Sequence, residues 1–405
     1  MGIRTPSQAA RRAAALTEAH GRAHEPPEIR ATLMDDPQGM DDPKGSAGRL
    51  VWLLTDDRPG NRSQAIGTAR ALGWPYDEKR LVFNDRSKRA TPRLGATLET
   101  LDEASRVALA PPWPDLVIGA GRRVAPVARF VGRASRGRAR VVLVGRRTPS
   151  EDVDLAIRCA YFTQVHGPRV LELALPPTKV DAAALAAAGR APDPFEGLAR
   201  PRCAVLVGGP TGAHLFDAAF AEAMARDLAA AARDAGASLA FVTSRRTPAD
   251  AVAAMRRGAP GALVREWRPD GPPDAILAVF AQADLLAVTG ESESMLAEAV
   301  ASGKPLTILP LAEHRAGWKQ RIRDRVARAA LGSGPLAGLC AKAMREGWVA
   351  PRRDLSALHA VIESHGWGKV FDGRLDATAP APRDEDRLVR ERILALFPHA
   401  GEATT

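Results

Sequence analysis

From residue 50 onward, short apolar runs of strand length alternate with amphipathic stretches of helix length. Runs that consist almost entirely of Val, Ile and Leu are typical of strands buried on both faces, as in parallel sheets. When such strands alternate with helices, the chain forms βαβ units. The pattern therefore predicts an α/β protein made of doubly wound, Rossmann-like sheets.

The alternation occurs twice, and a stretch rich in proline separates the two halves. The apolar runs predict strands at residues 51–55, 80–83, 115–119, 141–145 and 154–158, and then at 203–207, 238–243, 262–266, 284–289 and 305–309. Helices are expected at residues 62–72, 124–132, 215–235, 248–257, 273–283, 292–302 and 384–397. Two such halves joined by a linker form a cleft between domains, which is the usual place for a ligand.

These halves define the expected domains. We place a first domain at 49–175, a linker at 176–202 and a second domain at 203–375. Residues 1–48 are rich in Ala, Arg and turn formers and are predicted to be a disordered tail, while 376–405 are predicted to be a C-terminal helix and tail. The N-terminal segment lacks the apolar stretch of roughly 7–15 residues that a secretion signal carries.

The chain carries 57 Lys+Arg against 47 Asp+Glu, a formal net charge of +10. Such an excess favours anionic partners, although a basic composition without a single target explains it equally well. Aromatic residues are not interleaved with the basic ones, so nucleic-acid binding is not predicted. No apolar run approaches the ~18 residues that a membrane-spanning helix needs.

Three cysteines, Cys159, Cys203 and Cys340, lie far apart in the sequence. This spacing excludes a disulfide scaffold and a cysteine-rich zinc site, and it fits a reducing compartment. The Asp152-x-Asp154 string could hold a divalent metal through oxygen ligands, but two spaced aspartates often arise by chance. The histidines show no zinc spacing. We therefore expect a cytoplasmic protein without a metal site.

The segment from Ala287 to Pro310 is the strongest candidate site. A strand ends before the polar turn Glu291-Ser292-Glu293-Ser294, which opens a helix. Because the carboxyl ends of parallel strands face the ligand crevice, the first helical turn could bind phosphate. Glu298 lies one turn further along and could accept two hydrogen bonds from a ribose diol. The alternative is a capped helix whose glutamates merely suit its dipole.

Two other strand ends carry ligand-type residues. Ser244, Arg245, Arg246 and Thr247 follow one strand and form a plausible diphosphate cradle, or else a solvated turn with a threonine cap. The segment Val207–His214 follows another strand, and its Gly208 and Gly209 allow close backbone approach to a ligand. It is not a Walker loop, because no Lys-Ser/Thr pair follows the last glycine.

In the first half, Asp56 and Asp57 come directly after the first strand, at its carboxyl end. One of them could act as a general base on an incoming hydroxyl group. The tight turn at Pro59–Gly60 follows. Turn and cap chemistry alone also selects Asp, Pro, Gly and Asn, so a purely structural role for this segment is equally consistent.

The segment Ile118–Pro126 contains Gly119-x-Gly121, but Val124 stands where a dinucleotide fingerprint has its third glycine. An NAD site is therefore not predicted. A glycine-rich turn with Arg122 and Arg123 at the start of a helix suits an anionic group instead.

Several of these segments occur in an order that resembles one known family over residues 50–400. They are LTDDRPGN, PDLVIGAGRRVAPVARF, AVLVGGPTGAH, VTSRRTP, VTGESESMLAEAVASGKPLTILPL and VFDGRLD. The family is the bacterial one named after the plant elongated-mitochondria, or mitochondrial-fission, protein. Its fold looks like the GT-B glycosyltransferase superfold, in which two Rossmann-like domains face each other across a cleft.

The resemblance implies specific roles for the candidate residues. Donor contacts are implied for the second domain. The diphosphate would be contacted by Ser244, Arg245, Arg246 and Thr247, and the ribose by Glu298, with Ser292 and Ser294 beside it. The predicted donor site also includes Gly208, Gly209 and Glu291. An acceptor-side loop is implied for the first domain at Asp56, Gly60 and Gln64. We predict that Asn61, Gly121 and Arg122 also lie on this acceptor side, with Asp56 or Asp57 as the base. The family usually has glycine where this chain has Asp57, which leaves the identity of the base open.

The resemblance also implies an activity. The leading hypothesis is a metal-independent glycosyltransferase that uses a nucleotide-activated sugar as co-substrate and needs no other cofactor, because arginines and a helix N-terminus neutralise the leaving diphosphate. Candidate acceptors are lipid-linked or cell-envelope molecules, which would place a cytoplasmic protein at the inner, acidic face of the membrane. One alternative is an adaptor on the same scaffold without catalysis, as the plant relative suggests. Another, a nucleotide-sugar epimerase with bound NAD, is weakened by the broken glycine fingerprint.

Overall fold

The computed structural model describes residues 48–145, 153–161, 167–272, 274–314, 317–346, 348–349 and 354–397. Four sequence predictions involve residues outside these ranges. They are the disordered tail apart from residue 48, the Asp152 half of the two-aspartate string, the first residue of the helix expected at 273–283, and the end of the C-terminal segment from residue 398.

The first sheet has six parallel strands in the order β2-β1-β3-β4-β5-β6. Its strands are β1 (Val51–Thr55), β2 (Asp77–Arg80), β3 (Leu116–Ala120), β4 (Arg140–Val144), β5 (Leu155–Cys159) and β6 (Val170–Leu173). Its helical elements are α2 (Pro59–Leu72), η1 (Asp85–Lys88), α3 (Thr91–Leu94), α4 (Glu103–Val107) and α5 (Ala125–Ala134).

The second sheet also has six parallel strands, in the order β12-β11-β10-β7-β8-β9. Its strands are β7 (Arg202–Val207), β8 (Ser238–Thr243), β9 (Leu263–Arg265), β10 (Leu285–Thr289), β11 (Leu306–Leu309) and β12 (Lys369–Val370). The helices in this part of the chain are α6 (Ala182–Ala188), α7 (Ala218–Asp234), α8 (Ala249–Gly258), α9 (Ala275–Gln282), α10 (Glu293–Ala301), α11 (Trp318–Ala330), α12 (Ala337–Arg345) and α13 (Leu355–Ser364).

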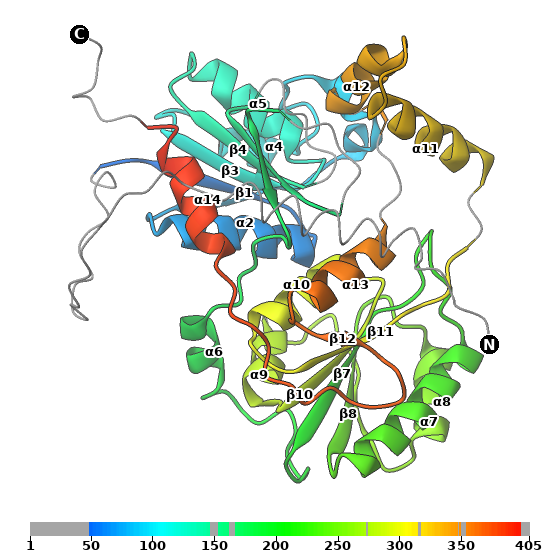
Figure 1. Cartoon of the computed structure of the whole chain (residues 1–405). Helices are drawn as coiled ribbons and strands as arrows, with labels where there is room; N and C mark the ends of the chain where they lie inside the picture. The colour runs from blue at the N-terminus through cyan, green and yellow to red at the C-terminus, as the bar shows by residue number, and fades with distance from the viewer. Residues whose placement is uncertain are drawn as a thin grey trace, which may run out of the picture.

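Each sheet is covered by helices on both faces, so four apolar clusters form around two sheets. In the first sheet, α2 packs on one face and α5 on the other. In the second sheet, α7 and α8 cover one face, while α9, α10 and α13 cover the other. Successive strand residues alternate between these clusters, which is why the central strands are apolar throughout. The predicted class, two Rossmann-like doubly wound domains, is confirmed (Figure 1).

The sequence located the central strands within one residue at each end, but it misplaced or missed strands at the sheet edges. The strand predicted at 80–83 is placed too far along the chain. The strand β2 spans Asp77–Arg80 and pairs with β1 from Trp52 to Thr55. The strands β6 and β12 were not predicted. All three lie at a sheet edge and are largely half-buried or exposed, so no continuous apolar run marks them.

The C-terminal helix α14 (Glu385–Leu394) returns to the first domain and packs against α2 (Figure 1). Val389 and Ile393 of α14 are buried in the same apolar cluster as α2. Glu385, the first residue of the helix, accepts a hydrogen bond from the backbone of Leu175 at 3.2 Å, and Arg383, just ahead of it, donates to the carbonyl of Pro176 at 3.1 Å. The end of the chain is therefore fastened to the first domain, beside the segment where we place the linker.

The two domains touch through α2 of the first and α10 of the second. A Cβ atom added at Gly60 would lie 2.8 Å from the hydroxyl of Ser294. A Cβ at Gly67, two turns further along α2, would lie 2.4 Å from the backbone of Thr178. Glycine at both positions lets α2 lie directly on the other elements.

Within the described residues, no helix has the length and apolar character that crossing a membrane requires.

Candidate functional site

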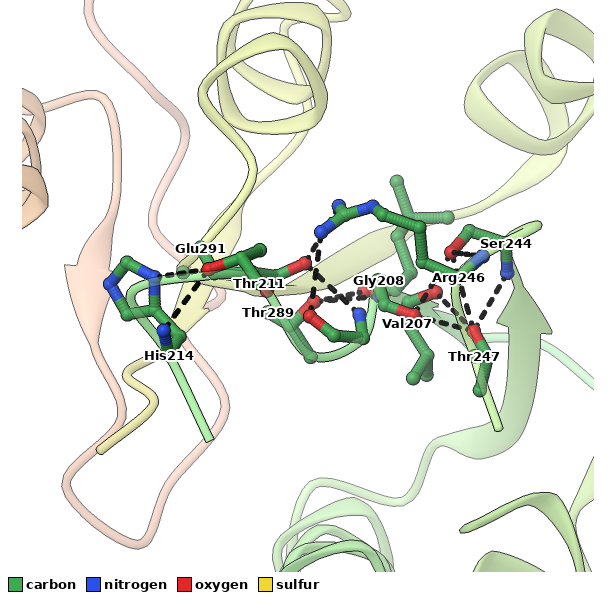
Figure 2. A network of polar contacts seen from close by, with 12 residues as sticks. Val207, Gly208, Thr211, His214, Ser244, Arg246, Thr247, Thr289 and Glu291 are labelled. Carbon is green, nitrogen blue, oxygen red and sulfur yellow. Dashed lines mark hydrogen bonds and ion pairs between the residues drawn. The ribbon is translucent and has the colours of Figure 1, made fainter. Parts of the chain in front are cut away.

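Three loops of the second domain meet at one edge of its sheet. They follow β7, β8 and β10, which are adjacent in the order β10-β7-β8. Because all three strands are parallel, their carboxyl ends lie together. The structure therefore brings together Gly208 and Gly209, Ser244 to Thr247, and Glu291, which are separated by up to 83 positions in the sequence (Figure 2).

The glycines after β7 pack directly on the other two loops. Gly208 donates its backbone N–H to the hydroxyl of Thr289 at 2.8 Å, and Gly209 donates to Glu291 Oε1 at 3.1 Å. A Cβ at Gly208 would lie only 1.7 Å from that same carboxylate oxygen. A Cβ at Gly209, whose φ is +159°, would lie 2.2 Å from the carbonyl oxygen of Arg246. No other residue type fits at either position without moving a neighbouring loop.

The two hydroxyls after β8 hold this loop to the glycine loop. Thr247 donates to the carbonyl of Gly208 at 2.6 Å, and Ser244 donates to the same carbonyl at 2.9 Å. Thr247 also accepts the backbone N–H of Ser244 at 2.9 Å. These hydroxyls, expected at a diphosphate, are engaged with the protein's own backbone (Figure 2).

The two arginines of this loop differ in their environment. Arg246 forms an ion pair with Glu291 at 2.9 Å, and the Glu291 side chain is fully buried. Glu291 Oε2 has no hydrogen-bond partner among the described residues. Arg245, in contrast, is exposed and makes no hydrogen bond or ion pair with any part of the chain that the structure describes. Since Glu291 balances the charge of Arg246, Arg245 is the cation left for an external anion.

The helix α10 begins at this edge without a side-chain cap. Ser292 is its N-cap residue, but its hydroxyl makes no capping hydrogen bond. The N–H groups of the first turn of a helix have no partner within the helix, and they attract anions when no side chain caps them. Ser292 is itself buried, so this end of α10 lies close beneath the surrounding loops.

Ser294 and Glu298 lie one turn apart on the face of α10 that meets the first domain. Ser294 packs on Gly60, and Glu298, which is 8% exposed, accepts a hydrogen bond from Ser63 of α2. Burial raises the pKa of Glu298, although the Ser63 hydroxyl and the charge of Lys179 partly offset this effect. In this arrangement α2 covers the carboxylate that the resemblance assigns to a ribose.

The carboxylates of the first domain lie at the end of β1. The Asp56 side chain is fully buried and accepts hydrogen bonds from Arg123 Nη2 at 2.8 Å and from the amide of Asn61 at 3.1 Å. The Asp57 side chain is 71% exposed and also pairs with Arg123. Burial alone would raise the pKa of Asp57, but the hydrogen bond and charge of Arg123 outweigh it and lower the pKa below its usual value.

The other acceptor-side candidates surround this pair. Gly121 has a φ of +86°, and a Cβ there would lie 2.4 Å from the Asn61 amide. Arg122 donates to the carbonyls of Arg89 at 2.6 Å and of Ser87 at 2.9 Å, so it holds the η1 segment. Burial and the neighbouring arginines lower the pKa of Arg122. Gln64 is half-buried on α2, three residues beyond Asn61.

Three residues with functional side chains are not among the site residues that the sequence predicts. The sequence indicates Arg123 only as a basic residue at a helix start that suits an anionic group, whereas in the structure it forms ion pairs with both Asp56 and Asp57. His359 of α13 donates from Nε2 to the carbonyl of Gly290 at 2.9 Å, and burial lowers its pKa. His214 is buried, with Nδ1 3.0 Å from the Thr211 hydroxyl and Nε2 3.4 Å from Glu313. Nothing in the sequence around His359 indicates that it reaches a loop 69 residues away.

The two sheets, with their polar loops at the carboxyl ends of the strands, define a protein of two Rossmann-like α/β domains. The description "Mitochondrial fission ELM1" belongs to the family whose sequence pattern matches residues 59–330. The chain belongs to this family, which confirms the family predicted from the sequence motifs. No curated protein matches the chain.

Solved structures with some likeness to the chain include an epimerase and a glycosyltransferase. One is a co-structure of S. aureus MnaA with UDP, at 10% identity and a TM-score of 0.42, covering 85% of this chain and 95% of that one. Another is UDP-GlcNAc 2-epimerase from Methanocaldococcus jannaschii, at 10% identity and a TM-score of 0.42, covering 86% and 99%. A third is the calicheamicin glycosyltransferase CalG4, at 13% identity and a TM-score of 0.40, covering 86% and 94%.

The contact of Gly208 with Glu291 leads to a first prediction. Gly208→Ala is expected to lower the free energy of unfolding by roughly 1–3 kcal/mol, because the new methyl group displaces the buried carboxylate. The matched control is Gly212→Ala in the same loop, where a Cβ meets nothing within 4 Å. Thermal unfolding of both variants measures the difference. Equal stability of the two would contradict the packing described here.

The burial of Glu298 leads to a second prediction, on pH dependence. Because its pKa is raised above the ordinary value of 4.5 in the folded state, its contribution to stability falls as pH rises from 4.5 through the folded-state pKa. Glutamine cannot ionise, so Glu298→Gln is expected to have a higher free energy of unfolding than the unaltered protein at neutral pH. The gain should shrink as the pH approaches 4.5.

Urea unfolding at a series of pH values measures this gain, with Glu266→Gln as the control at an exposed glutamate. If Glu298→Gln is less stable than the unaltered protein at neutral pH, the attraction of Lys179 and Ser63 outweighs burial, and the prediction is wrong.

Proposed function

We propose that this protein is a metal-independent glycosyltransferase that moves a sugar from a nucleotide-activated donor to an acceptor hydroxyl. The observation that carries the proposal is the sheet edge of the second domain, where the exposed Arg245 lies on the loop beside Gly208 and Gly209, and where α10 begins without a side-chain cap. An unpaired guanidinium and an uncapped helix N-terminus are the groups that bind phosphates. They supply positive potential where a diphosphate leaving group would gain charge.

The proposed donor site is organised by the other residues of that edge. Glu291, which is buried, forms an ion pair with the half-buried Arg246, and Ser244 and Thr247 tie the loops through the Gly208 carbonyl. In this proposal these four residues position the loops, and Arg245 meets the diphosphate. Glu298 would meet the ribose only when α2 moves away from α10, since α2 covers it here.

The proposed acceptor side is the end of β1 in the first domain. The new bond forms between the acceptor oxygen and the anomeric carbon, the bond from that carbon to the diphosphate breaks, and the diphosphate leaves with the electron pair. The acceptor proton passes to Asp57, whose exposed carboxylate is ionised at neutral pH, as an ordinary aspartate is, and whose pKa Arg123 lowers further. Asp56, which is enclosed by Arg123 and Asn61, positions this arginine.

The acceptor is proposed to be a lipid-linked or cell-envelope molecule, and the protein to act in the cytoplasm at the inner face of the membrane. The net charge of +10 supports an acidic membrane surface as a partner. A non-catalytic adaptor on the same scaffold is the second candidate, because the family to which the chain belongs carries the description "Mitochondrial fission ELM1".

A third prediction concerns donor binding. Arg245→Ala is expected to weaken binding of a nucleoside diphosphate by about 10- to 100-fold, since a hydrogen bond to a charged group contributes roughly 1.5–3 kcal/mol. Calorimetric titration with uridine, guanosine and adenosine diphosphates measures the loss. Arg233→Ala, at an exposed arginine on α7, is the control. If no diphosphate binds the folded, unaltered protein, the adaptor candidate replaces the transferase.

A fourth prediction separates the two aspartates. Asp57→Asn is expected to lower the rate of diphosphate release from the donor by about 10²- to 10⁴-fold while leaving donor affinity unchanged, as loss of a general base does. Asp56→Asn is expected to lower the thermal stability as well, because it removes the charge that holds Arg123. Full turnover in Asp57→Asn would overturn the assignment of the base.

A further inference from the structure

The helices α11 and α12 form a hairpin, here called the α11–α12 hairpin, that comprises residues 317–346. It is inserted in the chain between β11 and β12 of the second sheet. Among the described elements, each of these two helices packs extensively only on the other. Figure 1 shows the hairpin at the margin of the molecule, away from the body of the second domain. Most of its surface is therefore uncovered.

Exposed apolar side chains concentrate in this hairpin and the tryptophan just after it. Eleven large hydrophobic side chains are exposed in the described part of the chain, and six of them lie between residues 318 and 348. They are Trp318, Ile322, Leu331, Leu336, Leu339 and Trp348. Single exposed hydrophobic residues are ordinary on a protein surface, but a group within so short a stretch marks an interaction site.

The spacing of residues on α11 places apolar and basic side chains on one face. Trp318 and Ile322 are four residues apart, and Arg325 follows three residues later, so all three point to the same side of the helix. Trp318 is 63% exposed and Ile322 49% exposed. On the opposite side of the helix, Ala327 is buried. The exposed stripe therefore faces away from the hairpin's own contact.

The hairpin also carries a large share of the positive charge. Residues 317–346 include seven basic side chains and two acidic ones, a net charge of +5, against +10 for the whole chain. Most of the basic residues are exposed and lie on α11, where arginine or lysine occurs at 319, 321, 323, 325 and 328. A helix with tryptophan and aliphatic residues on one face and arginines flanking it is the kind that lies in a membrane interface.

We propose that the α11–α12 hairpin docks on an anionic lipid bilayer. Trp318 and Ile322 enter the boundary between headgroups and acyl chains, where the indole ring keeps its N–H at the polar level. Arginines such as Arg321 and Arg325 place their stems along the apolar surface and their guanidinium groups at the lipid phosphates. The burial of apolar side chains and the attraction of arginines to lipid phosphates both act at this surface. Neither effect alone explains why apolar and basic residues concentrate there together.

Other occupants fit the hairpin less well. A second copy of the chain would bring two surfaces of net charge +5 together, and like charges at an interface oppose association. A nucleic acid would use the arginines but leaves the leucines and Ile322 without a role.

The hairpin also adjoins the first domain, where the acceptor is expected. The guanidinium of Arg93, on α3, lies 6.0 Å from the ring of Trp348 at the base of the hairpin. A bilayer held at the hairpin would thus lie beside the domain that we propose receives a lipid-linked acceptor. This consequence rests on the proposed function, but the docking itself does not.

Flotation of the full-length protein with vesicles tests the proposal. One set contains phosphatidylcholine alone, and the other contains equal amounts of phosphatidylcholine and phosphatidylglycerol. The unaltered protein is expected to float with the second set and not with the first, and added salt should weaken binding. Changing both Trp318 and Ile322 to Ser should abolish flotation. Changing both Arg321 and Arg325 to Gln should weaken the partition coefficient by about 25-fold, at about fivefold for each arginine.

Two matched controls keep the test specific. Trp267→Ser alters an exposed tryptophan of the second domain, and changing Arg190 and Arg233 to Gln removes two exposed arginines elsewhere. Both should bind vesicles as the unaltered protein does. Docking is overturned if the unaltered protein ignores anionic vesicles, if the hairpin variants bind them normally, or if Trp318 and Ile322 instead sustain a dimer in solution. Calorimetry with nucleoside diphosphates on the same variants separates this result from a failure of the donor site.

Discussion

The carboxylate of Glu291 is the group on which the arrangement of the second domain's loops depends. It accepts the backbone N–H of Gly209 and pairs with Arg246, so it ties the loops after β7, β8 and β10 together. A buried charge is costly unless it is paired, and removing one partner leaves the other uncompensated. The pairing therefore fixes the relative positions of three loops that lie far apart in the sequence. The absence of a side chain at Gly208 gives the carboxylate room, and its absence at Gly209 gives room to Arg246.

A corresponding ion pair organises the first domain. Arg123 at the start of α5 holds Asp56 and Asp57 at the end of β1, as Arg246 holds Glu291 in the second domain. In both domains a charge on one strand's loop is neutralised by an arginine from another strand's loop, the adjacent strand in the first domain and the strand beyond β7 in the second. This leaves one partly exposed group on each side, Asp57 in the first domain and Arg245 in the second, and these are the groups available to a ligand.

The contact between α2 and α10 connects the two domains and controls what the second one exposes. Gly60 allows the approach to Ser294, and Ser63 meets the buried Glu298. Glu298 loses hydration in this contact, which is why burial raises its pKa. Any ligand that needs Glu298 must compete with α2, so access to that carboxylate is coupled to the separation of the domains.

The sequence by itself determined the fold class, the central strands and the loops that follow them, because strands buried on both faces must be apolar throughout and their ends must carry turn residues. It could not locate the edge strands β2, β6 and β12, which are only partly covered and so lack that apolar signal. Only the tertiary structure decided which charges pair and which stay open. Arg245 and Arg246 are adjacent in sequence, yet a carboxylate 45 residues away from Arg246 neutralises that arginine alone. Pairing depends on distances of a few ångströms across strands, and local sequence does not encode those distances.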